Sequence, residues 1–195
     1  MTAPPTRRSG RGARGRITRA AAELFYRRGI HATGVDLLAR EAQVSKRTFY
    51  QHFSSKTEAV VDYLRTIDAA GGSPMERRLD TTDLRPRERL LAIFDGSTSR
   101  RFRGCPFHNA AVESAGELTG IDEIVRAHKQ QFADRLAAVA ADAGATDPFL
   151  LAQQLLVLFE GATALSTSVN ETAPLVHARS AAAQLIDSAC APTER

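Results

Sequence analysis

The densest group of side chains that could recognise another molecule lies in the segment 45–56. Lys46 and Arg47 can donate hydrogen bonds to O6 and N7 of guanine, and Gln51 can pair with adenine. Lys56 can donate to a phosphate. Three further side chains can reach the phosphate oxygens of a nucleic acid: Thr48, Tyr50 and His52. These residue types favour DNA recognition if a helix presents them on one side.

The elements that must position these side chains are short helices. A helix over Val35–Ala42, a turn over Gln43–Ser45 and a helix over Lys46–His52 have the lengths of a helix-turn-helix, whose second helix enters the major groove. Thr33 and Ser45 are placed to cap the two helices. Four apolar residues are expected to face inward: Leu38, Ala39, Val44 and Phe49. Because this packing also occurs in proteins that bind no DNA, spacing alone leaves both possibilities open.

The rest of the chain also has helical periodicity. Ahead of the segment, an apolar stripe ends at Gly29 and consists of Ile17, Ala20, Ala21, Leu24 and Phe25. Ser55 and Glu58 form a capping box that opens a helix through Ile67. Further helices are expected from about 86, from 106 to about 117, and over 122–143, 148–169 and 174–190. With no strand-like alternation, the fold class is all-α, with about nine helices.

Charge is distributed unevenly along the 195 residues. Residues 1–60 carry 12 Lys and Arg against 4 Asp and Glu, and the remainder carries 14 against 18. A basic first third suggests contact with a polyanion, although a solvated basic face has the same composition. Residues 1–13 are expected to form a disordered basic arm. Its arginines, with two that follow, either enter the minor groove or only raise nonspecific affinity: Arg7, Arg8, Arg11, Arg14 and Arg16.

Residues 16–64 resemble the N-terminal domain of the TetR family of bacterial regulators. The resemblance is carried by Ala21-x-x-Leu24-Phe25-x-x-x-Gly29 and by Val44-Ser45-Lys46-x-Thr48-x-Tyr50-x-His52-Phe53-x-Ser55-Lys56. It implies that Lys46–His52 is the recognition helix and that Thr33 and Lys56 contact backbone phosphates. The DNA-contacting set is therefore expected to be Thr33, Ser45, Lys46, Arg47, Thr48, Tyr50, Gln51, His52 and Lys56.

The same resemblance implies the organisation of the C-terminal part. Two shorter matches, Arg103–Glu113 and Leu158–Ala162, also look like segments of TetR-type proteins. In that family the fourth to seventh helices enclose an effector pocket, and the last two helices, 148–169 and 174–190 here, form the interface of a homodimer. Residues that could line a pocket for a hydrophobic or aromatic ligand are Tyr63, Ile67, Phe94, Phe102, Phe107, His108, Val112, His128, Phe132 and Phe159.

Cys105 and His108 offer an alternative chemistry, because residues three apart share one face of a helix. A thiol–imidazole pair can act as a nucleophile, but no third orienting residue is evident, and an enzyme is the remote alternative. A thiol at the start of a helix could instead sense oxidants. Two ligands fall short of a zinc site, so neither a metal nor a cofactor is expected.

The sequence therefore predicts three segments: an arm (1–13), a helix-turn-helix domain (14–56) and an effector-binding and dimerisation domain (57–195). No apolar run at the N-terminus follows its basic residues, and the two cysteines form no disulfide framework, so we expect a cytoplasmic protein without a membrane span. Its partners are expected to be a palindromic double-stranded operator and a small-molecule effector that releases a repressor from it. An activator is the alternative within the same class.

Overall fold

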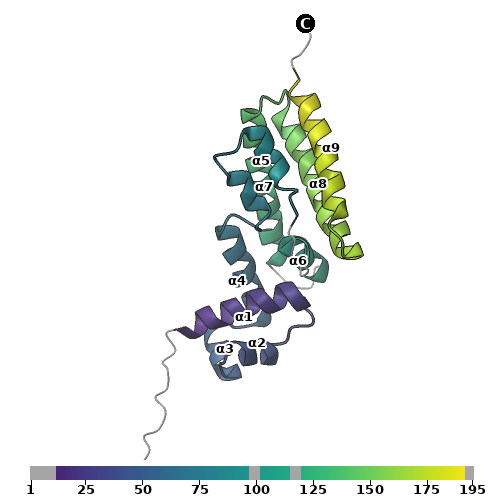
Figure 1. Ribbon diagram of the computed structural model, residues 1–195. Helices are drawn as coiled ribbons and strands as arrows, with labels where there is room; N and C mark the ends of the chain where they lie inside the picture. Colours follow the sequence, from purple (N-terminus) through teal and green to yellow (C-terminus); the bar gives the residue numbers. More distant parts are fainter. Residues whose placement is uncertain (1–11, 97–101, 115–119, 192–195) are drawn as a thin grey trace, which may run out of the picture. The chain divides into compact units, whose positions relative to one another are not determined.

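The computed structural model describes residues 12–96, 102–114 and 120–191. These residues contain nine α-helices, a short 3-10 helix and no strand, which confirms the all-α prediction (Figure 1). The chain divides into two compact units, Met1–Tyr63 and Leu64–Arg195. In chain order the elements are α1 (Ala13–Arg28), α2 (Val35–Glu41), α3 (Lys46–His52), α4 (Lys56–Ala69), η2 (Glu76–Asp80), α5 (Pro86–Ala92), α6 (Pro106–Ser114), α7 (Ile121–Asp142), α8 (Pro148–Val169) and α9 (Ala173–Ala189).

The first unit is built on the apolar stripe of α1. All five residues of the stripe expected from the sequence are buried, as is Ala13 at the start of the helix. Helices α1, α2 and α3 pack against one another, and Leu38 and Phe49 are fully buried between them. Phe53, directly after α3, packs on Phe49 with a ring-centroid distance of 5.7 Å. Aromatic burial therefore anchors the inner side of α3.

The turn between α2 and α3 depends on one residue in the left-handed region. Gln43 has φ 52°, a conformation that a residue with a Cβ adopts at a cost. The turn is closed by the N–H of Val44, which donates to the carbonyl of Ala39 at 2.9 Å. Ser45 then caps α3 as expected, because its Oγ accepts from the Thr48 N–H at 3.0 Å.

Thr33 does not cap α2. The N-cap position is Gly34, and no side chain accepts a hydrogen bond there. The Thr33 side chain is buried, and its Oγ1 donates to the carbonyl of Gly29 at 2.7 Å. The hydroxyl therefore holds the loop after α1 instead of the first turn of α2.

The second unit has one apolar core between α5, α7, α8 and α9. Phe132 of α7 contacts Phe159 of α8 edge-on at 5.4 Å between centroids, and Phe94 contacts Phe159 at 6.2 Å. All three rings are at most 1% exposed. Helices α8 and α9 lie side by side (Figure 1), with Leu175 and Ile186 of α9 turned into the core. Asp147 caps α8 through the Leu150 N–H at 3.0 Å.

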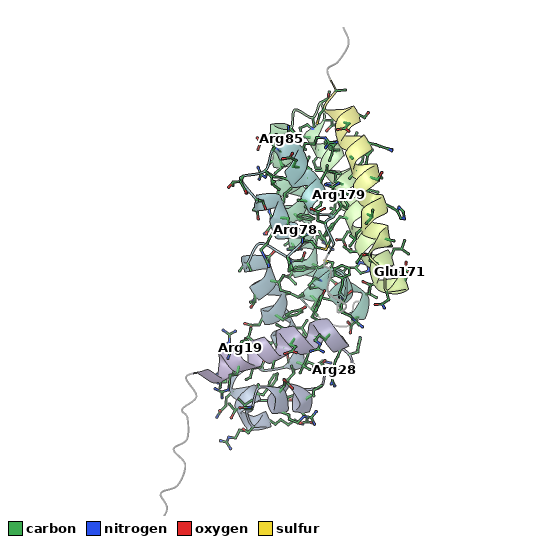
Figure 2. All side chains as sticks on the ribbon, viewed as in Figure 1. Arg19, Arg28, Arg78, Arg85, Glu171 and Arg179 are labelled. Atoms are coloured by element: carbon green, nitrogen blue, oxygen red, sulfur yellow. The ribbon has the colours of Figure 1, made fainter. Side chains whose placement is uncertain are left out.

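Two ion pairs fasten α9 to the region of α5. Arg179, labelled in Figure 2, donates through Nε to Asp95 at 3.0 Å. Arg87 makes a two-pronged contact with Asp187, with N–O distances of 2.7 and 2.9 Å. Within the described ranges, α8 is the one helix long and apolar enough to cross a membrane by length and composition. A core helix meets the same criterion, and α8 packs between α7 and α9.

Phe132→Ala tests the importance of this aromatic core. The change leaves a cavity beneath α7 and α8, so the free energy of unfolding should fall by about 3–5 kcal/mol in urea titrations followed by circular dichroism. The adjacent Gln131, which is exposed on α7, supplies the control. Gln131→Ala should change the free energy of unfolding by less than about 0.5 kcal/mol. Equal losses from both changes would contradict the assignment.

Candidate nucleic-acid interface

Helix α3 presents polar side chains on the side opposite its buried ring. Phe49 is fully buried, whereas the Tyr50 side chain, which packs edge-on against Phe49, is 48% exposed. Three further exposed side chains share the open side of the helix: Lys46, Arg47 and Gln51. This is the arrangement that base-edge and phosphate contacts require, because the inner ring fixes the helix while the outer donors stay hydrated until DNA replaces water.

The other residues expected to contact DNA have additional partners. Ser45 and Thr48 share a hydrogen bond between their hydroxyls at 2.8 Å, and His52 is half-buried. Lys56 donates to the carbonyl of Ile30 at 3.0 Å. Since an ammonium has three donors, this bond orients Lys56 and leaves two N–H groups for a phosphate.

Thr33 lies off the candidate surface, which corrects the expectation that it contacts a phosphate. Its side chain is fully buried and its hydroxyl is used by the carbonyl of Gly29. Two arginines grouped with the basic arm also belong elsewhere. Arg14 and Arg16 lie in α1, where they donate to Asp62 at 2.5 Å and to the carbonyl of Ala42 at 3.1 Å. The remaining arm residues, 1–11, lie outside the described residues.

An ion pair between α2 and α3 was missed by the sequence reasoning. Both carboxylate oxygens of Asp36 lie close to the ammonium of Lys46, at 3.0 and 3.2 Å. Both side chains are exposed, Asp36 at 80% and Lys46 at 55%. The hydrogen bond and the charge of Asp36 raise the pKa of Lys46 above its ordinary value. An acidic side chain therefore lies beside the first residue of α3.

Comparison with known proteins identifies the family of this architecture. Residues 17–61 match the family model described as "Bacterial regulatory proteins, tetR family". The crystal structure of a TetR transcriptional regulator of Streptomyces avermitilis is 30% identical, with a TM-score of 0.74 over 91% of this chain and 97% of that one. The chain belongs to the TetR family. It is a DNA-binding transcriptional regulator, and proteins of this family are not enzymes.

Other TetR-family relatives are similar over different lengths. SCO4454, a TetR-family regulator of Streptomyces coelicolor, is 28% identical with a TM-score of 0.79 over 91% of this chain and 96% of that one. FasR of Mycolicibacterium smegmatis, named an HTH-type transcriptional activator, is 44% identical over 85 residues. The match covers 42% of this chain and only 39% of FasR. TcmR of Streptomyces glaucescens, an HTH-type regulator, is 37% identical over 68 residues, or 30% of its length.

In the second unit of this TetR-family protein, a buried histidine lies between two carboxylates. Nδ1 of His128 on α7 is 2.7 Å from Asp68 on α4, and Nε2 is 3.1 Å from Glu76 on η2. Each ring nitrogen therefore lies within hydrogen-bond distance of a carboxylate oxygen. Phe107 of α6 stacks on this ring at 3.5 Å between centroids. The arrangement ties three elements, α4, η2 and α6, to α7.

Glu76 is fully buried and depends on these partners. Burial raises the pKa of Glu76, but hydrogen bonds and charge from His128, with the Ser73 N–H, outweigh it and bring the pKa below its ordinary value. Arg135 reinforces the same region by donating to the carbonyl of Gly71 at 3.1 Å and to Asp80 at 2.7 Å. No local pattern predicts this cluster, because His128 is 60 residues from Asp68 and 52 from Glu76.

The ten residues expected to line an effector pocket do not share one environment. His128 uses both ring nitrogens within the chain, and Val112 is 64% exposed. Tyr63 packs on Phe25 in the first unit. Phe102, Ile67 and His108 are partly exposed. The others are packed in the interior: Phe94, Phe107, Phe132 and Phe159.

Cys105 contacts a second cluster of charged side chains in this unit. Lys129 donates to its Sγ at 3.3 Å and to Glu160 at 2.5 Å, and Nδ1 of His108 lies 3.8 Å from Glu160. The thiol is 3% exposed, and burial raises its pKa to about 11. The thiolate is the reactive form, so this environment suppresses nucleophilic and redox chemistry at neutral pH.

Glu76→Gln tests the buried contact between Glu76 and His128. Removing one partner of a buried ion pair should lower the free energy of unfolding at pH 7 by about 3–5 kcal/mol. Because the folded-state pKa of Glu76 is depressed, its contribution is present above the unfolded pKa, about 4.3, and disappears as the pH falls below it.

The difference between wild type and Glu76→Gln should therefore narrow in urea titrations as the pH is lowered from 7 towards 3. Asp134→Asn removes an exposed carboxylate from the same helix as His128 and should leave stability nearly unchanged at each pH. A constant difference between wild type and Glu76→Gln would contradict the ionised state of Glu76.

Proposed function

We propose that residues 14–56 bind a palindromic operator with α3 in the major groove. The observation that carries the proposal is the division of α3 into a buried side, fixed by Phe49, and an exposed side with Lys46, Arg47, Tyr50 and Gln51. N-terminal residues of such a helix contact base edges, and neighbouring polar residues contact phosphates. Ser45, Thr48, His52 and Lys56 complete the proposed surface.

We further propose that the active species is a homodimer formed through 148–169 and 174–190. The outer side of α8 carries an exposed stripe without a charged residue: Leu150, Gln154, Val157, Gly161, Leu165 and Ser168. Exposed Val176 on α9 extends its apolar character. A stripe of this kind suits a self-complementary interface, and twofold symmetry would place two recognition helices about 34–36 Å apart.

Residues 57–195 are proposed to bind a small hydrophobic or aromatic effector that releases a repressor from DNA. Helix α4 offers a route, because it follows the helix-turn-helix directly at Lys56 and holds Asp68, the partner of His128, near its other end. An effector that displaced the Phe107–His128 stack would change the carboxylate contact on α4. Coupling requires the effector to bind two conformations of α4 with different affinity.

Activation is the second candidate function, favoured by one comparison. FasR is named a transcriptional activator and shares 44% identity over 85 residues. That match covers less than half of either chain, so the proposal remains a repressor with activation as the competing outcome.

The burial of Cys105 disfavours redox sensing. As a regulator of DNA, the chain is proposed to act in the cytoplasm.

Replacing Arg47 and Tyr50 together by alanine tests the DNA-binding surface. Operator duplexes are first selected by the wild-type protein from a random pool, and binding is then measured by fluorescence anisotropy over a range of salt concentrations. The double variant should lose specific binding and keep only weak, strongly salt-dependent binding. Arg27→Ala on α1 removes an exposed arginine outside the proposed surface and supplies a control that should retain specificity. Normal operator binding by Arg47→Ala/Tyr50→Ala would contradict the proposal.

Val157→Glu tests the homodimer. Val157 is 71% exposed in the single chain, and twofold association would bury two unpaired carboxylates. Sedimentation velocity should show the dimer dissociation constant rising by at least about a hundredfold, with circular dichroism unchanged. Val112, also exposed but on α6, provides the control, since Val112→Glu should leave the dimer intact. A dimer unaffected by Val157→Glu would place the interface elsewhere.

A further inference from the structure

Asp36 occupies an unexpected position for an acidic residue in a DNA-binding unit. It is 80% exposed and lies against Lys46, the first residue of α3. A carboxylate that faced a phosphate would repel it, whereas carboxylates at base edges can accept from the amino group of cytosine. The position is therefore compatible with the proposed interface if Asp36 faces bases and not the DNA backbone.

The geometry of the ion pair leaves hydrogen-bonding capacity on both partners. The ammonium of Lys46 is held between the two carboxylate oxygens of Asp36, at 3.0 and 3.2 Å. An ammonium has three N–H donors, so at least one remains, and a carboxylate has about four acceptor positions. The two side chains thus present a donor directly beside an acceptor, each fixed by the other.

This pattern matches one kind of base-pair edge in the major groove. A G·C pair presents the acceptors N7 and O6 of guanine next to the N4 amino donor of cytosine. In an A·T pair the single donor, N6 of adenine, lies between two acceptors, so a lysine finds no two adjacent acceptors there. Deepening the proposed function, on which it rests, we propose that Asp36 and Lys46 together read one G·C pair in each half-site, Lys46 donating to guanine and Asp36 accepting from cytosine.

Under this proposal Asp36 is a specificity-determining residue and Lys46 is kept away from phosphates. The alternative is that Asp36 only stabilises the first turn of α2, where acidic residues are favourable. The two roles have different consequences. A residue that only supports α2 affects thermal stability and all DNA positions alike, whereas a reading residue changes the preference at one base pair.

The test compares base preferences of wild type, Asp36→Ala and Asp36→Asn, obtained by selection from a random duplex pool and checked by anisotropy on single-substitution duplexes. In wild type, replacing the assigned G·C pair by A·T should weaken binding about tenfold or more. Asp36→Ala should reduce that factor at this position alone. Asp36→Asn should move the preference there towards A·T, because an amide can pair with N6 and N7 of adenine.

Three further variants separate the effect of the Asp36–Lys46 pair from that of other charged residues. Glu23→Gln removes a carboxylate of the same unit that pairs with Arg27 on α1, and it should leave every base preference unchanged. Lys46→Ala and the double variant Asp36→Ala/Lys46→Ala should show the same base preference at the assigned position. Either change removes the Asp36–Lys46 ion pair, so the second substitution has nothing further to remove.

Several results would overturn the inference. Unchanged preferences in both Asp36 variants, or a uniform loss over all positions with a lower melting temperature, would leave Asp36 a structural role only. The proposed function would survive either result if the wild-type protein still showed its base preference and Arg47→Ala/Tyr50→Ala abolished it. A wild-type chain that selected no sequence at all would overturn both.

Discussion

The position of α3, the proposed recognition helix, depends on the backbone of one turn. Gln43 adopts φ 52°, which brings the N–H of Val44 to the carbonyl of Ala39 and reverses the chain within three residues. Directly after the turn Ser45 caps α3, and Phe49 is buried where α3 packs against α1. The turn and the buried ring of Phe49 therefore determine where the exposed donors of α3 lie. Because α3 cannot move without disturbing the turn or the ring, its donors keep a defined position. The same turn brings Asp36 next to Lys46.

The second unit contains buried charged side chains in the region where the resemblance implied an effector pocket. His128 and Lys129 are consecutive on α7, yet one is held by Asp68 and Glu76 and the other by Cys105 and Glu160. Such groups are costly to bury and costly to leave unpaired, so they favour one arrangement of the helices over others. An effector that entered this region would have to compete with those contacts. The cluster thus offers a physical basis for a change in α4, through Asp68.

Much of the fold could be predicted because its signals are local. The stripe of α1, the cap at Ser45 and the start of α8 at Asp147 each lie within a few residues of the structure they determine. The division of α3 into inner and outer sides followed from Phe49. Thr33 was misassigned because its burial depends on the loop after α1. The partners of His128 could not be predicted, since 52 and 60 residues separate them from it and no periodicity links them.

In the proposed complex, two copies of α3 read the major groove of one palindromic site. Methylation interference at guanine N7 on a selected operator tests it most directly, because that atom lies on the major-groove edge. We expect two blocks of interference related by twofold symmetry, with centres about 10 base pairs or a multiple of that apart. A single block, or binding indifferent to methylation at every guanine, would contradict it.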